Sequence, residues 1–231
     1  RRAAVSIRAG GAERRDLPVE LRWSGEPLGP SPVLFDDASL RQVPAQRFLE
    51  DGKEILAWII PGSIPAGGER RFTVYFGLDK EPAGSTVPAG SPVPAGSTVQ
   101  DGGVTVLPEG DGFIIDNGSA RLLLKPEGAH IYAWEAKELG GLDLTIPGEM
   151  GWAGFLDTSG EGRSAHYGIA VLARGPVLAK FLCRAASAGA PAKTISVWRG
   201  MPWVEVFLDR AVSYFWNFDG PDLASDGPSP G

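Results

Sequence analysis

Hydrophobic and polar residues alternate with a period of two over several short stretches of the first 79 residues. In Val19–Trp23 the valine, leucine and tryptophan fall on one face of an extended chain, while the glutamate and arginine between them fall on the other. Ala3–Ile7, Ile55–Ile60 and Phe72–Phe76 are apolar or alternating in the same way, and Pro-Gly, Gly-Gly and Asp-Gly pairs separate such stretches. The pattern predicts a small all-β domain over residues 1–81.

The second half of the chain has the same character. Phe113–Asp116 and Ser119–Leu124 flank Asn117-Gly118, a pair that favours the two-residue turn of a β-hairpin. Trp203–Asp209 alternates, with valines and a leucine on one face. The spacing of these signals predicts an antiparallel β-sandwich over residues 100–231. The one helical candidate is a short turn near Glu135–Leu139.

Between these halves, Pro82–Val99 consists of three nearly identical hexads that begin with Pro-Ala-Gly-Ser. Proline removes a backbone donor and glycine adds conformational freedom, so a packed element is not expected there. Three repeats are also too few to build a solenoid core. We therefore predict a linker over residues 82–99, and an all-β protein of two domains.

Charge and composition narrow the classes of function. The 231 residues carry 22 basic and 28 acidic side chains, a net charge of −6, which argues against a nucleic-acid partner. The longest apolar run, Ile55–Ile60, is far shorter than the roughly 20 residues that span a bilayer, so no membrane span is predicted. A single cysteine, Cys183, excludes an internal disulfide, and its apolar surroundings predict a buried structural thiol. The chain has sixteen arginines and six lysines, and only five asparagine and glutamine residues in total. This composition fits a GC-rich coding sequence and equally a protein from a thermophile.

The most informative stretch for function is Ala129–Trp134. In a strand, His130, Tyr132 and Trp134 would share one face, and three small or apolar residues would share the other. Aromatic rings with polar groups suit sugars, whose C–H faces stack on rings while their hydroxyls form hydrogen bonds. The alternative interpretation is an aromatic-rich core or a seam between two sheets. The further aromatic candidates for glycan binding are Trp152, Tyr214 and Trp216.

Histidine and tyrosine can act as general acids or bases, and arginine can neutralise an anionic substrate. The candidates of these types are His130, Tyr132, His166, Tyr167 and Arg163.

A metal site is not predicted. Calcium binding by the three aspartates of Asp219–Asp226 is the one open possibility, but the EF-hand spacing is absent and a solvated acidic tail is the favoured interpretation. No other cofactor is indicated.

Several segments resemble exo-rhamnogalacturonan-lyase-like bacterial proteins. In the first half these are Leu17–Leu21, Asp36–Gln46, Ile64–Gly67 and Phe72–Gly77, and in the second half Ile115–Gly118, Lys193–Ser196 and Pro202–Val206. The resemblance implies a small β-barrel domain followed by the start of a galactose-mutarotase-like supersandwich. It also implies an extracellular or cell-surface protein that is part of a polysaccharide lyase or hydrolase acting on pectin-like acidic glycans. It assigns no catalytic residue.

A full supersandwich needs more residues than follow the linker, so the second domain is expected to be truncated or reduced. Such a domain would expose strand edges, through which copies of the chain could pair into a homo-oligomer or filament. Two other functions therefore remain open beside the enzyme: a self-assembling structural surface protein and a non-catalytic glycan-binding module, whose partner would be a polysaccharide or oligosaccharide.

Overall fold

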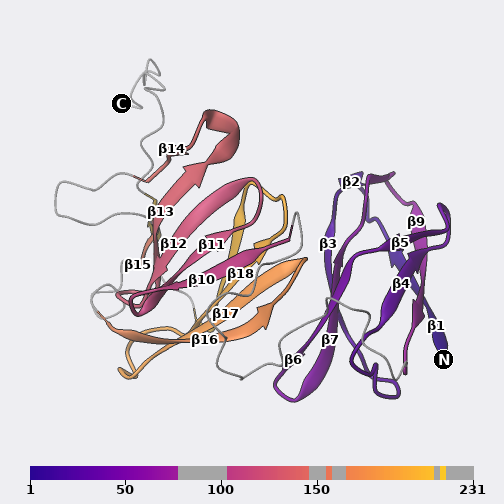
Figure 1. Cartoon of the computed structure of the whole chain (residues 1–231), viewed down its shortest axis with the longest axis horizontal. Helices are drawn as coiled ribbons and strands as arrows, with labels where there is room; N and C mark the ends of the chain where they lie inside the picture. Colours follow the sequence, from indigo (N-terminus) through magenta and orange to yellow (C-terminus); the bar gives the residue numbers. More distant parts are fainter. Residues whose placement is uncertain (78–102, 146–154, 158–164, 211–213, 217–231) are drawn as a thin grey trace. The chain divides into compact units, whose positions relative to one another are not determined.

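The computed structural model describes residues 1–77, 103–145, 155–157, 165–210 and 214–216 (Figure 1). This part of the chain is all-β, as the alternation predicted, and holds one short 3-10 helix, η1 (Lys137–Leu139), inside the predicted helical turn. Two compact units are present. The first comprises residues 1–105, 171–181 and 196–199, and the second comprises residues 106–170, 182–195 and 200–231.

Three sheets lie within the first 77 residues. One sheet has the strand order β1-β9-β4-β5, the next β3-β7-β6, and the smallest β2-β8. Their bounds are β1 (Arg2–Arg8), β2 (Arg14–Arg15), β3 (Pro18–Arg22), β4 (Val33–Asp36), β5 (Arg41–Val43), β6 (Ala45–Glu50), β7 (Lys53–Ile59), β8 (Ser63–Ile64) and β9 (Glu69–Tyr75). The four stretches in which alternation was strongest lie in β1, β3, β7 and β9, which confirms those strand predictions.

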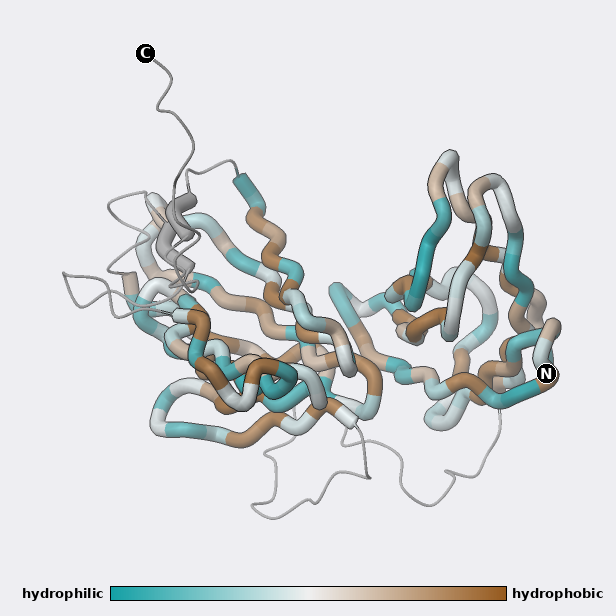
Figure 2. The backbone as a smooth tube through the Cα atoms, turned by 90° about the horizontal axis from the view of Figure 1, so that it is seen from above, coloured by the Kyte–Doolittle hydropathy of each residue, from teal (hydrophilic) through white to brown (hydrophobic). Residues whose placement is uncertain are grey.

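The two larger of these sheets share one hydrophobic core. Trp58 of β7 and Phe72 of β9 are both fully buried, and their rings meet edge to face with centroids 5.7 Å apart. Leu34, Leu56 and Val74 are buried in the same cluster. Figure 2 shows the alternation of hydrophobic and hydrophilic residues along the strands that makes this possible. In β9 one face is buried and the other more exposed, whereas β7 is buried on both faces from Ile55 to Trp58.

The remaining described strands form three more sheets. The strand orders are β10-β11-β12-β13-β14, β16-β17-β18-β19 and β15-β20. Their bounds are β10 (Thr105–Glu109), β11 (Gly112–Asp116), β12 (Ala120–Lys125), β13 (His130–Ala136), β14 (Leu142–Asp143), β15 (Phe155–Asp157), β16 (Tyr167–Arg174), β17 (Leu178–Ala185), β18 (Lys193–Trp198), β19 (Val204–Leu208) and β20 (Tyr214–Trp216).

The predicted hairpin is present as β11 and β12, but its turn lies one residue later than the sequence suggested. The Asn117 backbone N–H donates to the Ala120 carbonyl at 3.1 Å, so Gly118 and Ser119 form the tip. The Asn117 side chain is buried and acts as a brace. Its Oδ1 accepts from the N–H groups of Ser119 and Ala120, and its Nδ2 donates to the Met201 carbonyl at 2.7 Å.

A β-bulge interrupts the pairing of β12 with β13. Ala133 pairs with Leu123 and Ile131 pairs with Leu124, which leaves Tyr132 without an opposing residue. A bulge inserts one extra residue and re-aims the side chains around it. The strict alternation predicted for residues 129–134 therefore stops at Tyr132.

The predicted linker, residues 82–99, lies within residues 78–102, outside the described part of the chain, so that the two-domain division stays a prediction. Among the described residues, no helix has the length and apolar composition needed to cross a membrane.

A buried ion pair fixes the turn between β4 and β5. The Asp36 carboxylate is fully buried and accepts two bonds from the Arg70 guanidinium, at 3.0 and 2.6 Å, and one from the Ser39 hydroxyl at 2.6 Å. The bonds from Arg70 hold the pKa of Asp36 far below its ordinary value, against the opposing effect of burial. This charge is therefore present in the folded protein under all mild conditions.

We expect Arg70→Ala to lower the free energy of unfolding by about 3–5 kcal/mol, because it leaves a buried carboxylate without its partner. Arg8→Ala, which breaks the exposed pair with Glu69, is the matched control and should change the free energy of unfolding far less, because solvent screens an exposed pair. Urea denaturation at neutral pH measures both. The pKa of Asp36 is lower in the folded protein than in the unfolded protein. The pair therefore contributes to the free energy of unfolding above the ordinary aspartate pKa, and wild type should lose this contribution as the pH falls below that pKa. Equal costs for the two variants would contradict the assignment.

Candidate functional site

Several predicted site residues cannot be placed. Arg163 and Trp152 lie outside the described residues, as do the three aspartates of residues 219–226. Tyr214 and Trp216 lie on β20, which pairs with β15, but their side chains are not described. Their roles stay predictions.

His130 and Trp134 are placed, and both are buried. His130 is 1% exposed and Trp134 is 7% exposed, whereas Tyr132 between them is half-buried. Ile131, which the alternation assigned to the opposite face, is buried as well. The His130 and Tyr132 rings are still neighbours, with centroids 6.2 Å apart, but the burial of His130 and Trp134 leaves no open aromatic face. His130 and Trp134 pack in the interior in the manner of the alternative interpretation.

The turn between β12 and β13 is fixed to the start of β16. Glu127 and His166 form an isolated antiparallel bridge. On either side of it, the Gly128 N–H donates to the Ala165 carbonyl at 2.8 Å and the Tyr167 N–H donates to the Pro126 carbonyl at 2.9 Å. Two predicted residues, His166 and Tyr167, are thereby held beside the strand that carries Tyr132.

Three exposed side chains gather at this bridge, and we refer to Asp111, Glu127 and His166 as the surface cluster. One carboxylate oxygen of each acid and one imidazole nitrogen all lie within 4.8 Å of one another. Asp111 comes from the turn between β10 and β11, where Gly110 has φ 61°. Three separate segments therefore bring one potential ligand atom each to the same point on the surface.

Tyr132 and Lys125 belong to the surroundings of the surface cluster. Burial, and after it the negative charge of Glu127, raises the pKa of the Tyr132 hydroxyl above its ordinary value. The Lys125 ammonium lies over the Tyr132 ring, 4.7 Å from its centroid. A tyrosine hydroxyl is protonated at neutral pH with or without this shift, so Tyr132 can donate a hydrogen bond or a proton at this place.

On its inner side, the bridge packs against a buried polar side chain, Lys193. The Lys193 ammonium donates to the Gly128 carbonyl and lies over the Tyr167 ring at 5.1 Å, and both side chains are buried. His130 packs directly on Gly128, where φ is 63° and a side chain of any other residue would collide with the imidazole. Tyr167 and His130 are thus structural neighbours of the surface cluster rather than part of it.

The acids of the surface cluster, Asp111 and Glu127, were not predicted. Both lie in turns, and solvated acidic residues are common in turns. The useful signal was the topology. The turns before β11 and after β12 lie at the same end of a hairpin, so their residues become neighbours in space whatever their separation in sequence.

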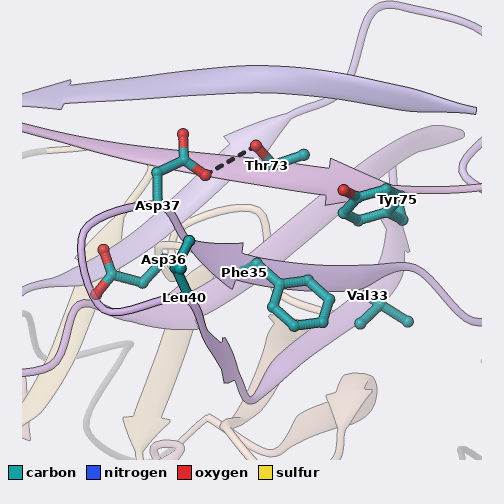
Figure 3. A pocket seen from close by; sticks show the side chains of 7 residues that line it. All are labelled: Val33, Phe35, Asp36, Asp37, Leu40, Thr73 and Tyr75. Carbon is teal, nitrogen blue, oxygen red and sulfur yellow. Dashed lines mark hydrogen bonds between the residues drawn. The ribbon is translucent and has the colours of Figure 1, made fainter.

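A second surface feature lies on the solvent face of the β1-β9-β4-β5 sheet (Figure 3). It is an open pocket of about 490 Å³, lined by Val33, Phe35, Asp36, Asp37, Leu40, Thr73 and Tyr75. The Phe35 and Tyr75 rings meet edge to face at 5.7 Å, and the Thr73 hydroxyl donates to the Asp37 carboxylate at 2.8 Å. Leu40, at the rim, is 80% exposed and has φ 55°, an unusual conformation for leucine.

The comparisons with known proteins give no family for this chain. No family model matches it, and neither does any of the curated proteins with which it was compared. The geometry and the sequence therefore carry the functional argument.

The buried thiol of Cys183 provides a separate test. Burial raises the pKa of the Cys183 thiol to about 12, although the charge of Lys193 opposes the shift. Thiolate is the reactive form, so a disulfide reagent at pH 8 should modify native Cys183 far more slowly than the same thiol in unfolded protein. The measurement is the release of the reagent's chromophore with and without guanidinium. Rapid stoichiometric reaction of the native protein would show that the thiol is accessible.

Proposed function

We propose that this protein is carbohydrate-active and acts on acidic, pectin-like glycans at the surface cluster. The observation that carries the proposal is the convergence of Asp111, Glu127 and His166 at one point of the surface, next to the half-buried Tyr132 and the Lys125 cation over its ring. The resemblance of the sequence to exo-rhamnogalacturonan-lyase-like proteins adds support. An extracellular or cell-surface location is part of the same proposal, because that is where such polysaccharides occur.

The proposed chemistry is elimination at a uronic acid residue. A base removes the proton from the carbon next to the carboxylate, a carbon–carbon double bond forms, and the bond to the glycosidic oxygen breaks. The departing oxygen keeps the electron pair and takes a proton from Tyr132. The base is the imidazole of His166, or a phenolate of Tyr132 that first takes the carbon proton and then returns it to the departing oxygen. His166 can also bind a metal ion through a ring nitrogen, but the same nitrogen cannot accept a proton at the same time.

The pocket of the first unit suits a neutral sugar. Phe35 and Tyr75 offer ring surface, while Asp37 and Thr73 offer an acceptor and a hydroxyl close by. The Asp37 carboxylate can accept hydrogen bonds from sugar hydroxyls, so a neutral residue of a mixed polysaccharide suits this pocket. A glycan-binding module without catalysis would use the same two surfaces but release no product.

Replacement of Tyr132 by phenylalanine tests the proposal, because it removes the proton donor and keeps the ring. We expect the release of unsaturated product from pectic oligosaccharides, followed by its ultraviolet absorbance, to fall by about 100-fold or more. Binding of the oligosaccharide, measured by calorimetry, should change little. Loss of turnover with binding retained separates a catalytic role from a merely structural one.

Tyr75→Phe is the matched control, since it makes the same chemical change in the pocket of the first unit. It should leave turnover at wild-type level. Absence of turnover in wild type together with tight binding would support the non-catalytic module instead. Absence of both would overturn the carbohydrate proposal.

A second candidate function is self-assembly, and the β19 strand is the observation that favours it. Within the described sheets, β19 is at the edge of the β16-β17-β18-β19 sheet, and its Phe207 is 70% exposed. A strand edge with an exposed aromatic residue can pair with another copy of the chain. The product would be a homo-oligomer or filament held by strand edges.

For this candidate we expect Phe207→Glu to abolish concentration-dependent self-association in sedimentation velocity, since it places a charge on the pairing edge. Leu139→Glu is the control, because Leu139 is also exposed, at 59%, but lies in η1 rather than on a strand edge. A wild-type protein that stays monomeric over a hundredfold range of concentration would exclude assembly through this edge.

A further inference from the structure

The surface cluster carries charge that nothing in the described structure balances. Asp111 and Glu127 are two carboxylates that converge on one imidazole. None of the ion pairs found among the described residues involves either acid. Lys125, the nearby cation, lies over the Tyr132 ring. Like charges held together cost free energy unless a cation joins them.

We propose that Asp111, Glu127 and His166 bind a divalent metal ion of the zinc and manganese class. The set contains one imidazole nitrogen and two carboxylate oxygens, which is the mixed donor set that these ions accept, whereas calcium and magnesium prefer oxygen alone. Three protein ligands leave coordination positions open for water or a ligand, as in catalytic rather than structural zinc sites. The imidazole distinguishes this cluster from an ordinary acidic patch.

The backbone holds these ligands while their side chains remain free to adjust. Bonds of about 2.0–2.2 Å in a tetrahedral site place neighbouring ligand atoms about 3.3–3.6 Å apart. The three donor atoms lie within 4.8 Å of one another, and all three residues are exposed, so small side-chain rotations close the difference. The Glu127–His166 bridge and its two flanking hydrogen bonds keep the segments in place.

Glycine packing positions the third ligand. At Gly112, next to Asp111, a side chain would collide with the Leu124 carbonyl, so the β10–β11 turn lies tightly against β12. The turn cannot move away from β12 without breaking this contact. Asp111 is therefore brought to the same end of the sheet as Glu127 by close backbone packing.

A bound cation would also deepen the proposed function, and this step alone rests on that function. Without a cation, two carboxylates repel an acidic glycan. With one, the glycan carboxylate can occupy an open coordination position, and its negative charge is neutralised, which makes the neighbouring carbon more acidic. His166 then serves as a ligand, and Tyr132 is left as the proton-transfer residue.

The experiment measures metal binding without any glycan. The chain has only two histidines, so selective ¹⁵N labelling of imidazoles gives a spectrum of two residues. The signals of His166 are those that are missing from the spectrum of His166→Gln. We expect Zn²⁺ to shift these signals in the wild-type protein. Calorimetry with Mn²⁺ and Zn²⁺ should give one site, weakened more than about 100-fold in Asp111→Asn and in His166→Gln, since even outer partners of metal ligands are worth about 10–100-fold.

Glu109→Gln is the control, because it removes one negative charge two residues from Asp111, outside the surface cluster. It should keep wild-type metal affinity, and circular dichroism should show all variants folded. A wild-type protein without a site, or Asp111→Asn and His166→Gln with unchanged affinity, overturns the proposal. Acidic-oligosaccharide binding with and without Zn²⁺ is a separate arm. Metal binding without glycan binding leaves the cation site standing and the proposed function refuted.

Discussion

The site depends on one constraint, the attachment of the β12–β13 turn to the start of β16. Two backbone hydrogen bonds, from Gly128 to Ala165 and from Tyr167 to Pro126, hold the two segments together. From the inner side, the buried Lys193 ammonium donates to the Gly128 carbonyl. Residues alternate in direction along these segments. Glu127 and His166 consequently face outward as neighbours, while Tyr167 faces the buried lysine.

The strands could be predicted from the sequence because one face of each is buried. Alternation identified β1, β3, β7, β9 and the β11–β12 hairpin, and these strands are present. The turn of the hairpin was harder, since Asn117 serves as a buried brace rather than as a turn residue. A tip at Asn117-Gly118 would have paired Asp116 with Ser119. The actual tip pairs Asp116 with Arg121, and so moves every partner along the hairpin by two residues.

The register of the hairpin also explains why the sequence predicted only some residues of the candidate site. Histidine and tyrosine are recognisable from their chemistry, so His166 and Tyr132 were predicted. Asp111 and Glu127 become neighbours only through the register of the hairpin, which local patterns do not fix. The bulge at Tyr132 is a second effect of tertiary structure. It ends the period of two on which the expected aromatic face depended, and His130 and Trp134 are packed in the interior.

The two ways in which this chain treats acidic side chains separate structure from function. Asp36 is fully buried, and Arg70 and Ser39 satisfy its oxygens, so its charge serves the stability of a turn. Asp111 and Glu127 lie on the surface, close together, without a basic partner in the described ion pairs. Folding alone gains nothing from such an arrangement, since like charges repel and exposed acids need no neighbour. The proposed cation would remove this repulsion, and it would give the pair of acids a role in binding rather than in folding.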